Sequence, residues 1–81
     1  MQLEILTPAK KVFSGEVKLV KVPGSKGSFE IMKNHAAIIS TLMDGEVKIE
    51  TESGDTKCYK TIGGVVEVKN NQIVVLVESI Q

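Results

Sequence analysis

The chain has 81 residues, with ten lysines, no arginine, ten acidic residues and a formal net charge of +0 at pH 7. This length allows one small domain with one modest core and no separate substrate-binding domain, which argues against a complete enzyme. The balanced charge and the absence of arginine argue against a nucleic-acid binder that is held by a basic field.

The composition favours strands, because 24 of the 81 residues are Val, Ile or Thr and branched side chains pack well on a pleated surface. Turn signals recur at short intervals: Ser14-Gly15, Pro23-Gly24, Asp44-Gly45, Ser53-Gly54-Asp55, Gly63-Gly64 and Asn70-Asn71. In chain order, the expected strands are residues 2–7, 10–14, 17–22, 28–31, 37–41, 46–52, 56–62, 65–69 and 72–78. The sequence therefore predicts an all-β domain, a flattened sandwich or barrel of about nine or ten mostly antiparallel strands.

Two of the predicted strands alternate between apolar and charged residues. In residues 46–50 the apolar Val47 and Ile49 share one face and three charges share the other, and Val66-Glu67-Val68-Lys69 repeats this pattern. Strands of this kind have one dry and one solvated face, as an antiparallel sheet on a single core requires.

The last predicted strand differs, because Ile73 to Val77 is apolar on both faces. One interpretation is a central strand that its own domain covers on both sides. The other is that a second protein covers one face, since a small domain has few layers with which to bury both.

No residue pattern predicts catalysis or a metal site. His35 is the single histidine and Cys58 the single cysteine, and no carboxylate cluster accompanies them. We expect His35 to be a structural or surface imidazole that is hydrogen-bonded in a turn, and Cys58 to be a small buried or half-buried hydrophobe. A lone cysteine cannot form an internal disulfide, which favours a reducing setting.

Residues 1–81 predict neither a secretory signal nor a membrane span. Residues 1–7 include Glu4 among apolar residues and have no basic start, and the longest apolar run is Ile73 to Val77. A bilayer span needs about 20 apolar residues. Any work at a membrane would therefore go through a partner.

One tetrapeptide, Glu30-Ile31-Met32-Lys33, is similar to the Glu-Ala-Met-Lys-Met signature of biotinyl and lipoyl carrier domains. Those domains are also all-β and present a modified lysine on an exposed hairpin. Asn34 follows Lys33 where the carriers usually have a hydrophobe, and no matching half-domain precedes it. A carrier domain modified on Lys33 is kept as an alternative function.

A longer comparison covers almost the whole chain. The sequence resembles the N-terminal β-sandwich domain of the epsilon subunit of bacterial F-type ATP synthases, the counterpart of the mitochondrial delta subunit. The matching segments, in the family's order and spacing, are Leu3-Glu4-Ile5-Leu6-Thr7-Pro8, Val12-Phe13-Ser14-Gly15-Glu16-Val17, Val22-Pro23-Gly24, Gly27-Ser28-Phe29-Glu30-Ile31, His35-Ala36, Ile38-Ile39-Ser40-Thr41-Leu42, Asp44-Gly45-Glu46-Val47-Lys48-Ile49, Gly63-Gly64-Val65-Val66-Glu67-Val68 and Val74-Val75-Leu76.

The chain departs from the family at two places. It has Lys33-Asn34-His35-Ala36-Ala37 where the family commonly has Pro-Gly-His-Ala-Pro, and we expect the turn to survive because asparagine tolerates a left-handed backbone. Lys26 and Ser28 stand where the family often has acidic residues, so the charge of this loop differs.

The resemblance implies a non-catalytic rotor subunit at the foot of the central stalk. It would link the gamma subunit to the membrane-embedded ring of c subunits, so that ion-driven rotation is coupled to ATP synthesis. The expected ring contacts are Ser25, Lys26, Gly27, Ser28 and Glu30. The expected gamma contacts are Asn34, His35, Ala36, Val75 and Val77.

The resemblance also sets expectations for the rest of the assembly. Residues 1–81 correspond to the β-sandwich domain alone, without the two C-terminal helices that family members usually carry, so no bound ATP and no other cofactor is expected. The expected location is the cytoplasmic face of a bacterial cell membrane, as a peripheral protein that meets the membrane only through the c-ring. A plain adaptor domain that associates with itself is the third functional hypothesis.

Overall fold

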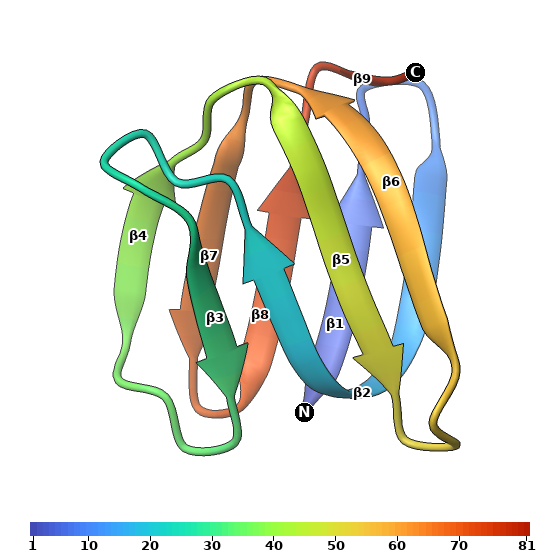
Figure 1. Ribbon diagram of the computed structural model, residues 1–81, viewed down its shortest axis with the longest axis vertical. Coiled ribbons are helices and arrows are strands. Elements are labelled where there is room, and N and C mark those ends of the chain that lie inside the picture. Colours follow the sequence, from blue (N-terminus) through green and yellow to red (C-terminus); the bar gives the residue numbers. More distant parts are fainter.

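The computed structural model describes residues 1–81, and strands are its only regular secondary structure (Figure 1). The strands are β1 (Gln2–Leu6), β2 (Lys11–Val22), β3 (Phe29–Met32), β4 (Ile38–Thr41), β5 (Gly45–Thr51), β6 (Thr56–Ile62), β7 (Val65–Lys69), β8 (Gln72–Leu76) and β9 (Ser79–Ile80). The prediction of an all-β fold of about nine or ten strands is confirmed, although two predicted strands are one and β9 was not predicted. The molecule has no helix with the length and apolar character that crossing a bilayer requires.

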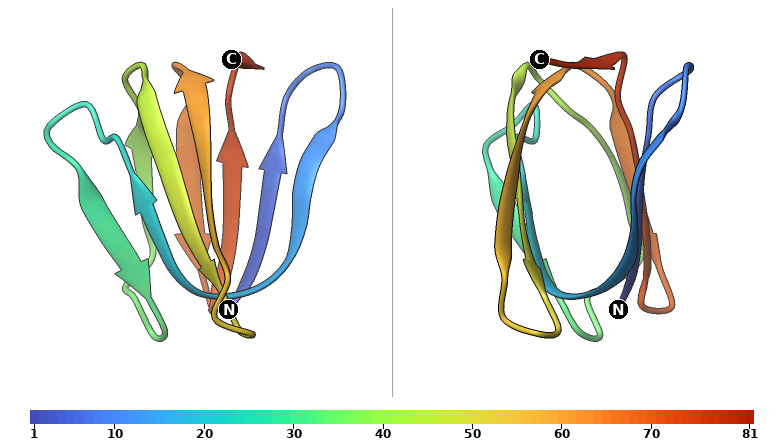
Figure 2. Two further views of the ribbon diagram at one scale, coloured as in Figure 1. Left: turned by 45° about the vertical axis from the view of Figure 1, so that its right-hand side comes forward. Right: turned by 90° about the vertical axis from the view of Figure 1, so that its right-hand side faces the viewer.

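The strands form two facing layers that share β2 (Figure 2). Hydrogen-bonded neighbours follow the order β4-β7-β8-β1-β2-β5-β6-β9, and β3 pairs with β2. We call β4, β7, β8, β1 and the first half of β2 the first sheet, and β3, the second half of β2, β5, β6 and β9 the second sheet. All pairs are antiparallel except β1 with β8, which agrees with the expected mostly antiparallel sandwich.

The prediction that two strands flank a turn at Ser14-Gly15 is wrong. Residues 11–22 form one strand that bends from the first sheet into the second, and Gly15 pairs with Leu3 inside it. A Cβ atom on Gly15 would lie 3.3 Å from Cζ of Phe13, so glycine leaves room for this ring. The register of β2 against β5 shifts between Val17 and Leu19, which is the irregularity that lets a long strand turn between sheets.

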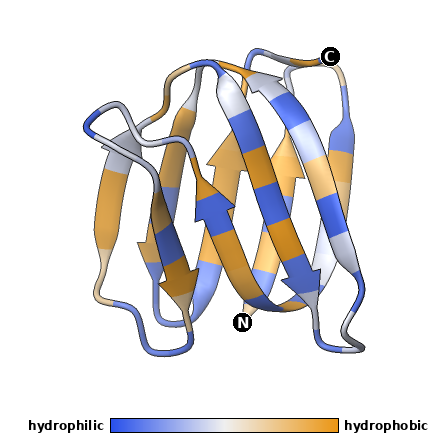
Figure 3. Ribbon diagram, viewed as in Figure 1, coloured by the Kyte–Doolittle hydropathy of each residue, from blue (hydrophilic) through white to orange (hydrophobic).

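The core lies between the two sheets and consists of inward-facing aliphatic side chains. Its buried members are Leu3, Ile5, Val17, Val20, Val22, Ile31, Leu42, Val47, Ile49, Val66, Val68, Ile73, Val75 and Val77. The alternation predicted for residues 46–50 and 66–69 is confirmed, and Figure 3 shows it as alternating colours along β5. Burial of these side chains is the main force that holds the sheets together.

The chain ends in an element that the sequence analysis missed. The expected last strand, residues 72–78, ends at Leu76 as β8, and the two-residue strand β9 follows beyond it and pairs with the end of β6. Glu78 lies between them, and its backbone N–H donates to Ile62 O at 3.0 Å. The chain therefore leaves the first sheet after Leu76 and closes over the top of the second (Figure 1).

Candidate interaction surfaces

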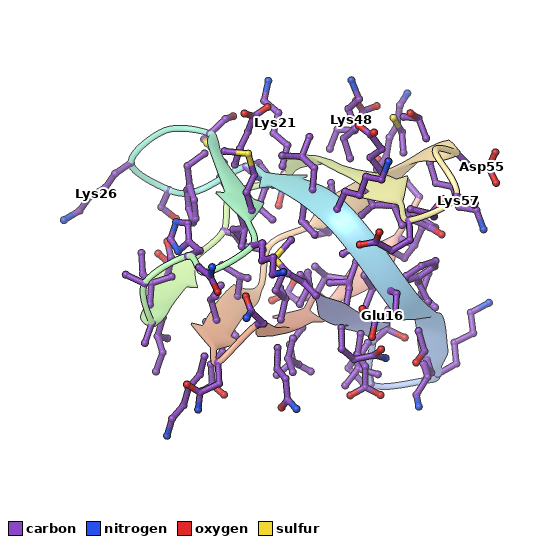
Figure 4. The ribbon with its side chains drawn as sticks, turned by 90° about the horizontal axis from the view of Figure 1, so that it is seen from below. Glu16, Lys21, Lys26, Lys48, Asp55 and Lys57 are labelled. Atoms are coloured by element: carbon purple, nitrogen blue, oxygen red, sulfur yellow. The ribbon has the colours of Figure 1, made fainter.

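The loop that joins β2 to β3 projects from one end of the sandwich, at the upper left of Figure 1. It carries Ser25, Lys26, Gly27 and Ser28, all exposed, and Lys26 points away from the body of the molecule in Figure 4. The loop begins in a tight turn in which Gly27 N–H donates to Gly24 O at 2.9 Å. A Cβ atom on Gly24 would lie 2.7 Å from Gly27 O, so only glycine fits there.

Two hydrogen bonds hold this loop against the end of β4. Ser25 N–H donates to Thr41 O at 3.0 Å, and Thr41 Oγ1 donates to Ser25 Oγ at 2.9 Å. The loop and β4 enclose an open cleft of about 650 Å³, whose apolar walls are Phe29, Ile38 and Ile39. The loop is thus anchored to the first sheet although it follows a strand shared with the second.

The fifth residue expected with this loop, Glu30, lies apart from it. Glu30 is an exposed residue of β3, directly opposite Lys21 on the outer surface of the second sheet. The structure therefore brings Ser25, Lys26, Gly27 and Ser28 together and places Glu30 on the strand that leads away from them.

The turn that carries Asn34, His35 and Ala36 joins β3 to β4 at the opposite end of these strands (Figure 1). Asn34 has a φ of 66°, which confirms that it takes the left-handed conformation of the turn. His35 Nδ1 donates to Ala36 O at 2.8 Å, and the His35 ring lies 6.4 Å from that of Phe29. The interpretation of His35 as an imidazole hydrogen-bonded in a turn is confirmed.

The choice of Val75 and Val77 as contact residues is wrong. Their side chains belong to the core, with exposed fractions of 0% and 4%. Ile73, Val75 and Val77 form the inward side of this segment, and alternation cannot tell the two sides apart where both are apolar. The outward residues of this strand are Val74, which is half-buried, and Leu76, which is 46% exposed.

An apolar row on the outside of the first sheet was missed. The register places Leu6, Leu76 and Val65 side by side across β1, β8 and β7. The next row contains Val74 beside Glu67, and Glu67 lies opposite Ile39, which is 70% exposed. We call Leu6, Ile39, Val65, Val74 and Leu76 the outer apolar face. The apolar outward residues of 73–77 were the available signal, but only the strand order brings them beside Val65 and Leu6.

The outside of the second sheet is mostly charged. Lys21 and Lys48 are directly opposite each other on β2 and β5, and their side chains extend to the same side in Figure 4. Cys58 lies opposite Lys48 and is exposed, so the expectation of a buried or half-buried cysteine is wrong. Figure 3 shows this surface as blue bands along β5 and β6.

The structure contains little that could support chemistry. No group of three His, Cys, Asp or Glu side chains is placed to hold a metal ion. The one perturbed titratable group is Tyr59 on β6, whose pKa is raised because burial disfavours the charged phenolate. The two ion pairs, Glu4 with Lys11 at 3.0 Å and Glu16 with the Met1 amino group at 3.2 Å, connect neighbouring strands.

Comparison with known proteins gives matches over the whole chain. The profile of the family described as "ATP synthase, Delta/Epsilon chain, beta-sandwich domain" matches residues 1–81. The ATP synthase epsilon chain of Chlorobium limicola is 38% identical over 79 residues, which cover 98% of this chain and 90% of that protein. The ATP synthase epsilon chain of Chlorobaculum tepidum is 35% identical over 78 residues and is covered to 89%.

Other relatives extend beyond the matched region. The ATP synthase epsilon chain of Pelotomaculum thermopropionicum is 40% identical over 75 residues, and the match covers 55% of its length. A chain in the Euglena gracilis mitochondrial ATP synthase (OSCP/F1/c-ring, rotational state 1) has a TM-score of 0.90 at 17% identity, and 51% of it is covered. A chain in the Tetrahymena thermophila mitochondrial ATP synthase central stalk/c-ring structure has a TM-score of 0.82 at 22% identity, with 65% covered. At these identities the two solved structures establish likeness of fold.

Proposed function

The chain belongs to the ATP synthase delta/epsilon-chain β-sandwich family, and we propose that it is a non-catalytic central-stalk subunit of an F-type ATP synthase. It binds the gamma subunit and the ring of c subunits and turns with them, so that ion-driven rotation reaches the catalytic sites. The match to epsilon chains over 98% of the chain is the single observation that carries this proposal.

The structure suits a part of this kind. A permanent mechanical link needs apolar surface to bind one protein stably and polar groups to contact a second protein. It needs no nucleophile or metal. The outer apolar face supplies the first, and the polar loop at residues 24–28 supplies the second. The loop extends from one end of the sandwich, whereas the outer apolar face lies along the outside of the first sheet.

For the ring contact we assign Ser25, Lys26, Gly27 and Ser28, with Glu30 beside them on β3. These residues are exposed, and the loop extends beyond the end of the sandwich (Figure 1). Its hydroxyl and backbone groups can meet the polar loops of the c subunits, and Lys26 brings a cation that can approach a carboxylate on the ring.

For the gamma contact we assign Asn34, His35 and Ala36, together with the outer apolar face in place of Val75 and Val77. Ile39 and Leu76 are among the large apolar side chains that the domain leaves exposed. The turn at residues 34–36 leads directly into β4, so turn and face make one continuous surface along the first sheet.

The proposed location follows from the partners. The subunit is peripheral at the cytoplasmic face of a bacterial cell membrane and meets the membrane only through the c-ring. Residues 1–81 act as the β-sandwich domain of an epsilon chain and bind neither ATP nor another cofactor.

Affinity purification of the tagged chain from its native organism, followed by mass spectrometry, tests the proposal. We expect gamma and c subunits among the recovered proteins, together with the catalytic subunits of the synthase. Recovery of the folded chain with neither gamma nor c would contradict it.

The carrier alternative is not favoured, because the relatives that match nearly the whole chain are epsilon chains. An intact-mass measurement on the native protein distinguishes the two, since a carrier would bear a covalent adduct on Lys33. The adaptor alternative predicts self-association in the absence of gamma, which light scattering detects.

A further inference from the structure

The strand β4 has one paired edge and one open edge. It is the terminal strand of the first sheet and is hydrogen-bonded only to β7. In Figure 1 its free edge forms the left border of the molecule, beside the loop at residues 24–28 and the turn at residues 34–36. An open strand edge presents unpaired N–H and C=O groups and can serve as a template for another strand.

The hydrogen bonds show which backbone groups face this open edge. Leu42 N–H donates to Gly64 O, so the backbone N–H and C=O groups of Leu42, Ser40 and Ile38 point toward β7. Thr41 O accepts from Ser25 N–H on the other side, so the backbone groups of Thr41 and Ile39 point away from β7. The loop already covers the Thr41 end, which leaves Ile39 as the central residue of β4 with a free N–H and a free C=O.

The part of this edge that the loop leaves open lacks two features that protect many edge strands, charge and proline. Charged side chains, proline and very short length prevent unwanted pairing in natural sheets. β4 reads Ile38-Ile39-Ser40-Thr41, without a charge or a proline, and Ile39 is 70% exposed. Two other terminal strands differ in this respect, because β3 carries Glu30 and is followed by Lys33, and β9 has only two residues.

The surroundings define what an added strand would contain. On the inner side of the edge lies the cleft of about 650 Å³, where Phe29 and Ile38 are apolar and the loop at residues 24–28 supplies polar and glycine residues. On the outer side Ile39 is exposed, and Glu67 lies between it and Val74. Because successive side chains of a strand point to opposite faces, an added segment would meet Ile38 and Phe29 on one side and Ile39 on the other. The site therefore fits a short, uncharged, extended segment that is rich in branched aliphatic residues.

We propose that the gamma subunit contributes such a segment to β4 and extends the first sheet by one strand. The choice of occupant rests on the proposed function and on continuity, because the edge adjoins both the 34–36 turn and the outer apolar face assigned to gamma. In this arrangement Ile39 N–H and C=O bond to the backbone of gamma. Main-chain bonds give the contact its rigidity, and the cleft selects the inward side chain.

Amide hydrogen exchange on the isotopically labelled full chain, free and bound to the gamma subunit of the same organism, tests this directly. We expect the Ile39 amide to exchange rapidly in the free chain and at least about tenfold more slowly in the complex, as for an amide that enters a ladder. Amides on the free edge of β3 serve as internal controls and stay unprotected.

Two variants of Ile39 distinguish the contribution of its backbone N–H to gamma binding from that of its side chain. Ile39→Ala removes the apolar contact and keeps the donor, whereas Ile39→Pro also removes the N–H, which an edge strand tolerates where this group faces outward. We expect Ile39→Pro to bind gamma about five- to tenfold more weakly than Ile39→Ala, the loss that one hydrogen bond represents. Thermal unfolding of both variants shows whether each is folded. If one variant is unfolded, the hydrogen-exchange measurement on the unmodified chain still tests the proposal.

The outcomes distinguish this inference from the function on which it rests. Binding of gamma without protection of Ile39, and with equal affinity for the two variants, overturns strand addition and leaves the stalk function intact. Failure of gamma to bind the unmodified chain overturns both. Protection of Ile39 in the free chain, with a dimer in sedimentation, would assign the edge to a second copy and overturn the choice of gamma.

Discussion

Asn34 and Asn71, which lie 37 residues apart in the sequence, exchange two hydrogen bonds across the lower end of the sandwich. Asn34 N–H donates to Asn71 Oδ1 at 2.7 Å, and Asn71 Nδ2 donates to Asn34 Oδ1 at 3.2 Å. Both residues have left-handed backbone conformations, with φ of 66° and 60°. The pair ties the β3–β4 turn, which we assign to the gamma contact, to the β7–β8 turn of the first sheet.

Replacement of Asn71 by alanine removes both bonds and places an alanine in a left-handed conformation. We expect the free energy of unfolding to fall by about 3 kcal/mol, since each bond contributes about 1 kcal/mol and the left-handed backbone of an alanine adds about 1 kcal/mol. Asn71→Asp retains the acceptor for Asn34 N–H and loses only the second bond, so it should cost about 1 kcal/mol. Urea denaturation measures both, and equal stability of Asn71→Ala and the unmodified chain would contradict a structural role for the pair.

Gly64 allows the close approach of β7 to the end of β8. Its φ is +122°, and a Cβ atom at this position would collide with Leu76 O and lie 2.9 Å from Val77 Cα. We expect Gly64→Ala to lower the free energy of unfolding by more than about 3 kcal/mol, because backbone atoms cannot move aside as a side chain can.

Gly54→Ala is the matched control. Its φ is also positive, +96°, but no atom lies within 4 Å of the added Cβ, so only conformational strain of about 1 kcal/mol should appear. Thermal and urea unfolding compare the two variants. Similar losses at both glycines would mean that the contact with Leu76 is relieved by movement of the strands.

The outer surface of the second sheet contains a pair of like charges. Lys21 and Lys48 lie directly opposite each other, whereas Lys60 lies opposite Glu46. Lys48→Thr should raise the free energy of unfolding by about 0.5 kcal/mol, and Lys60→Thr should leave it unchanged or lower it slightly. The gain at Lys48 should shrink as salt screens the repulsion, so urea denaturation at low and high ionic strength measures it. A gain that is independent of salt would assign the effect to strand propensity alone.

Much of the fold could be predicted from the sequence because buried apolar residues alternate with exposed polar ones along the strands. Val47 and Ile49 on β5 face the core as their alternation with charges requires. The continuous strand through Ser14 and Gly15 could not be predicted in this way, because a serine-glycine pair favours a turn locally. In the structure Gly15 is selected by its contact with the Phe13 ring, which is a tertiary effect.

The candidate surfaces could likewise be predicted only where local sequence determines them. The polar loop at residues 24–28 and the asparagine turn at residue 34 were predicted, since glycine and asparagine mark such positions locally. The outer apolar face was not, because Leu6, Val65 and Leu76 become neighbours only through the parallel pairing of β1 with β8 and the antiparallel pairing of β8 with β7. For the same reason Val75 and Val77 were assigned to a partner although they fill the core.

The stability of the domain should depend on the ionisation of Tyr59. Burial raises the pKa of its phenol above the ordinary value of 10.0. A raised pKa in the folded state means that the folded protein holds the proton more tightly than the unfolded chain, so stability is complete below pH 10 and declines as pH rises through the folded pKa.

Tyr59→Phe isolates the contribution of the Tyr59 phenol from the rest of the pH dependence of stability. No hydrogen bond to the phenol is present, so the variant should be nearly as stable as the unmodified chain at neutral pH. Above pH 10 we expect the unmodified chain to lose stability relative to Tyr59→Phe. Urea denaturation across this range measures the difference, and the phenolate absorbance of this single tyrosine gives the folded pKa directly. Parallel curves for the two proteins would contradict the predicted shift.

The bond from Thr41 Oγ1 to Ser25 Oγ joins the loop that we assign to the ring with β4, the strand that we assign to gamma. Thr41→Val removes this bond and keeps a branched side chain suited to a strand. Because the bond is exposed, the free energy of unfolding should change by less than about 0.5 kcal/mol, while the amides of Ser25 and Gly27 should exchange faster.

The change at Thr41 should affect binding to the c-ring and not binding to gamma. A looser loop must be ordered again on binding, so Thr41→Val should weaken binding to isolated c-rings about two- to fivefold and leave gamma binding unchanged. Thr56→Val is the matched control, because Thr56 is exposed on β6, far from the loop, and should change neither affinity. Surface plasmon resonance with each partner measures these affinities. If Thr41→Val and the unmodified chain bind c-rings equally well, the backbone bond from Ser25 to Thr41 O alone is enough to hold the loop in its binding conformation.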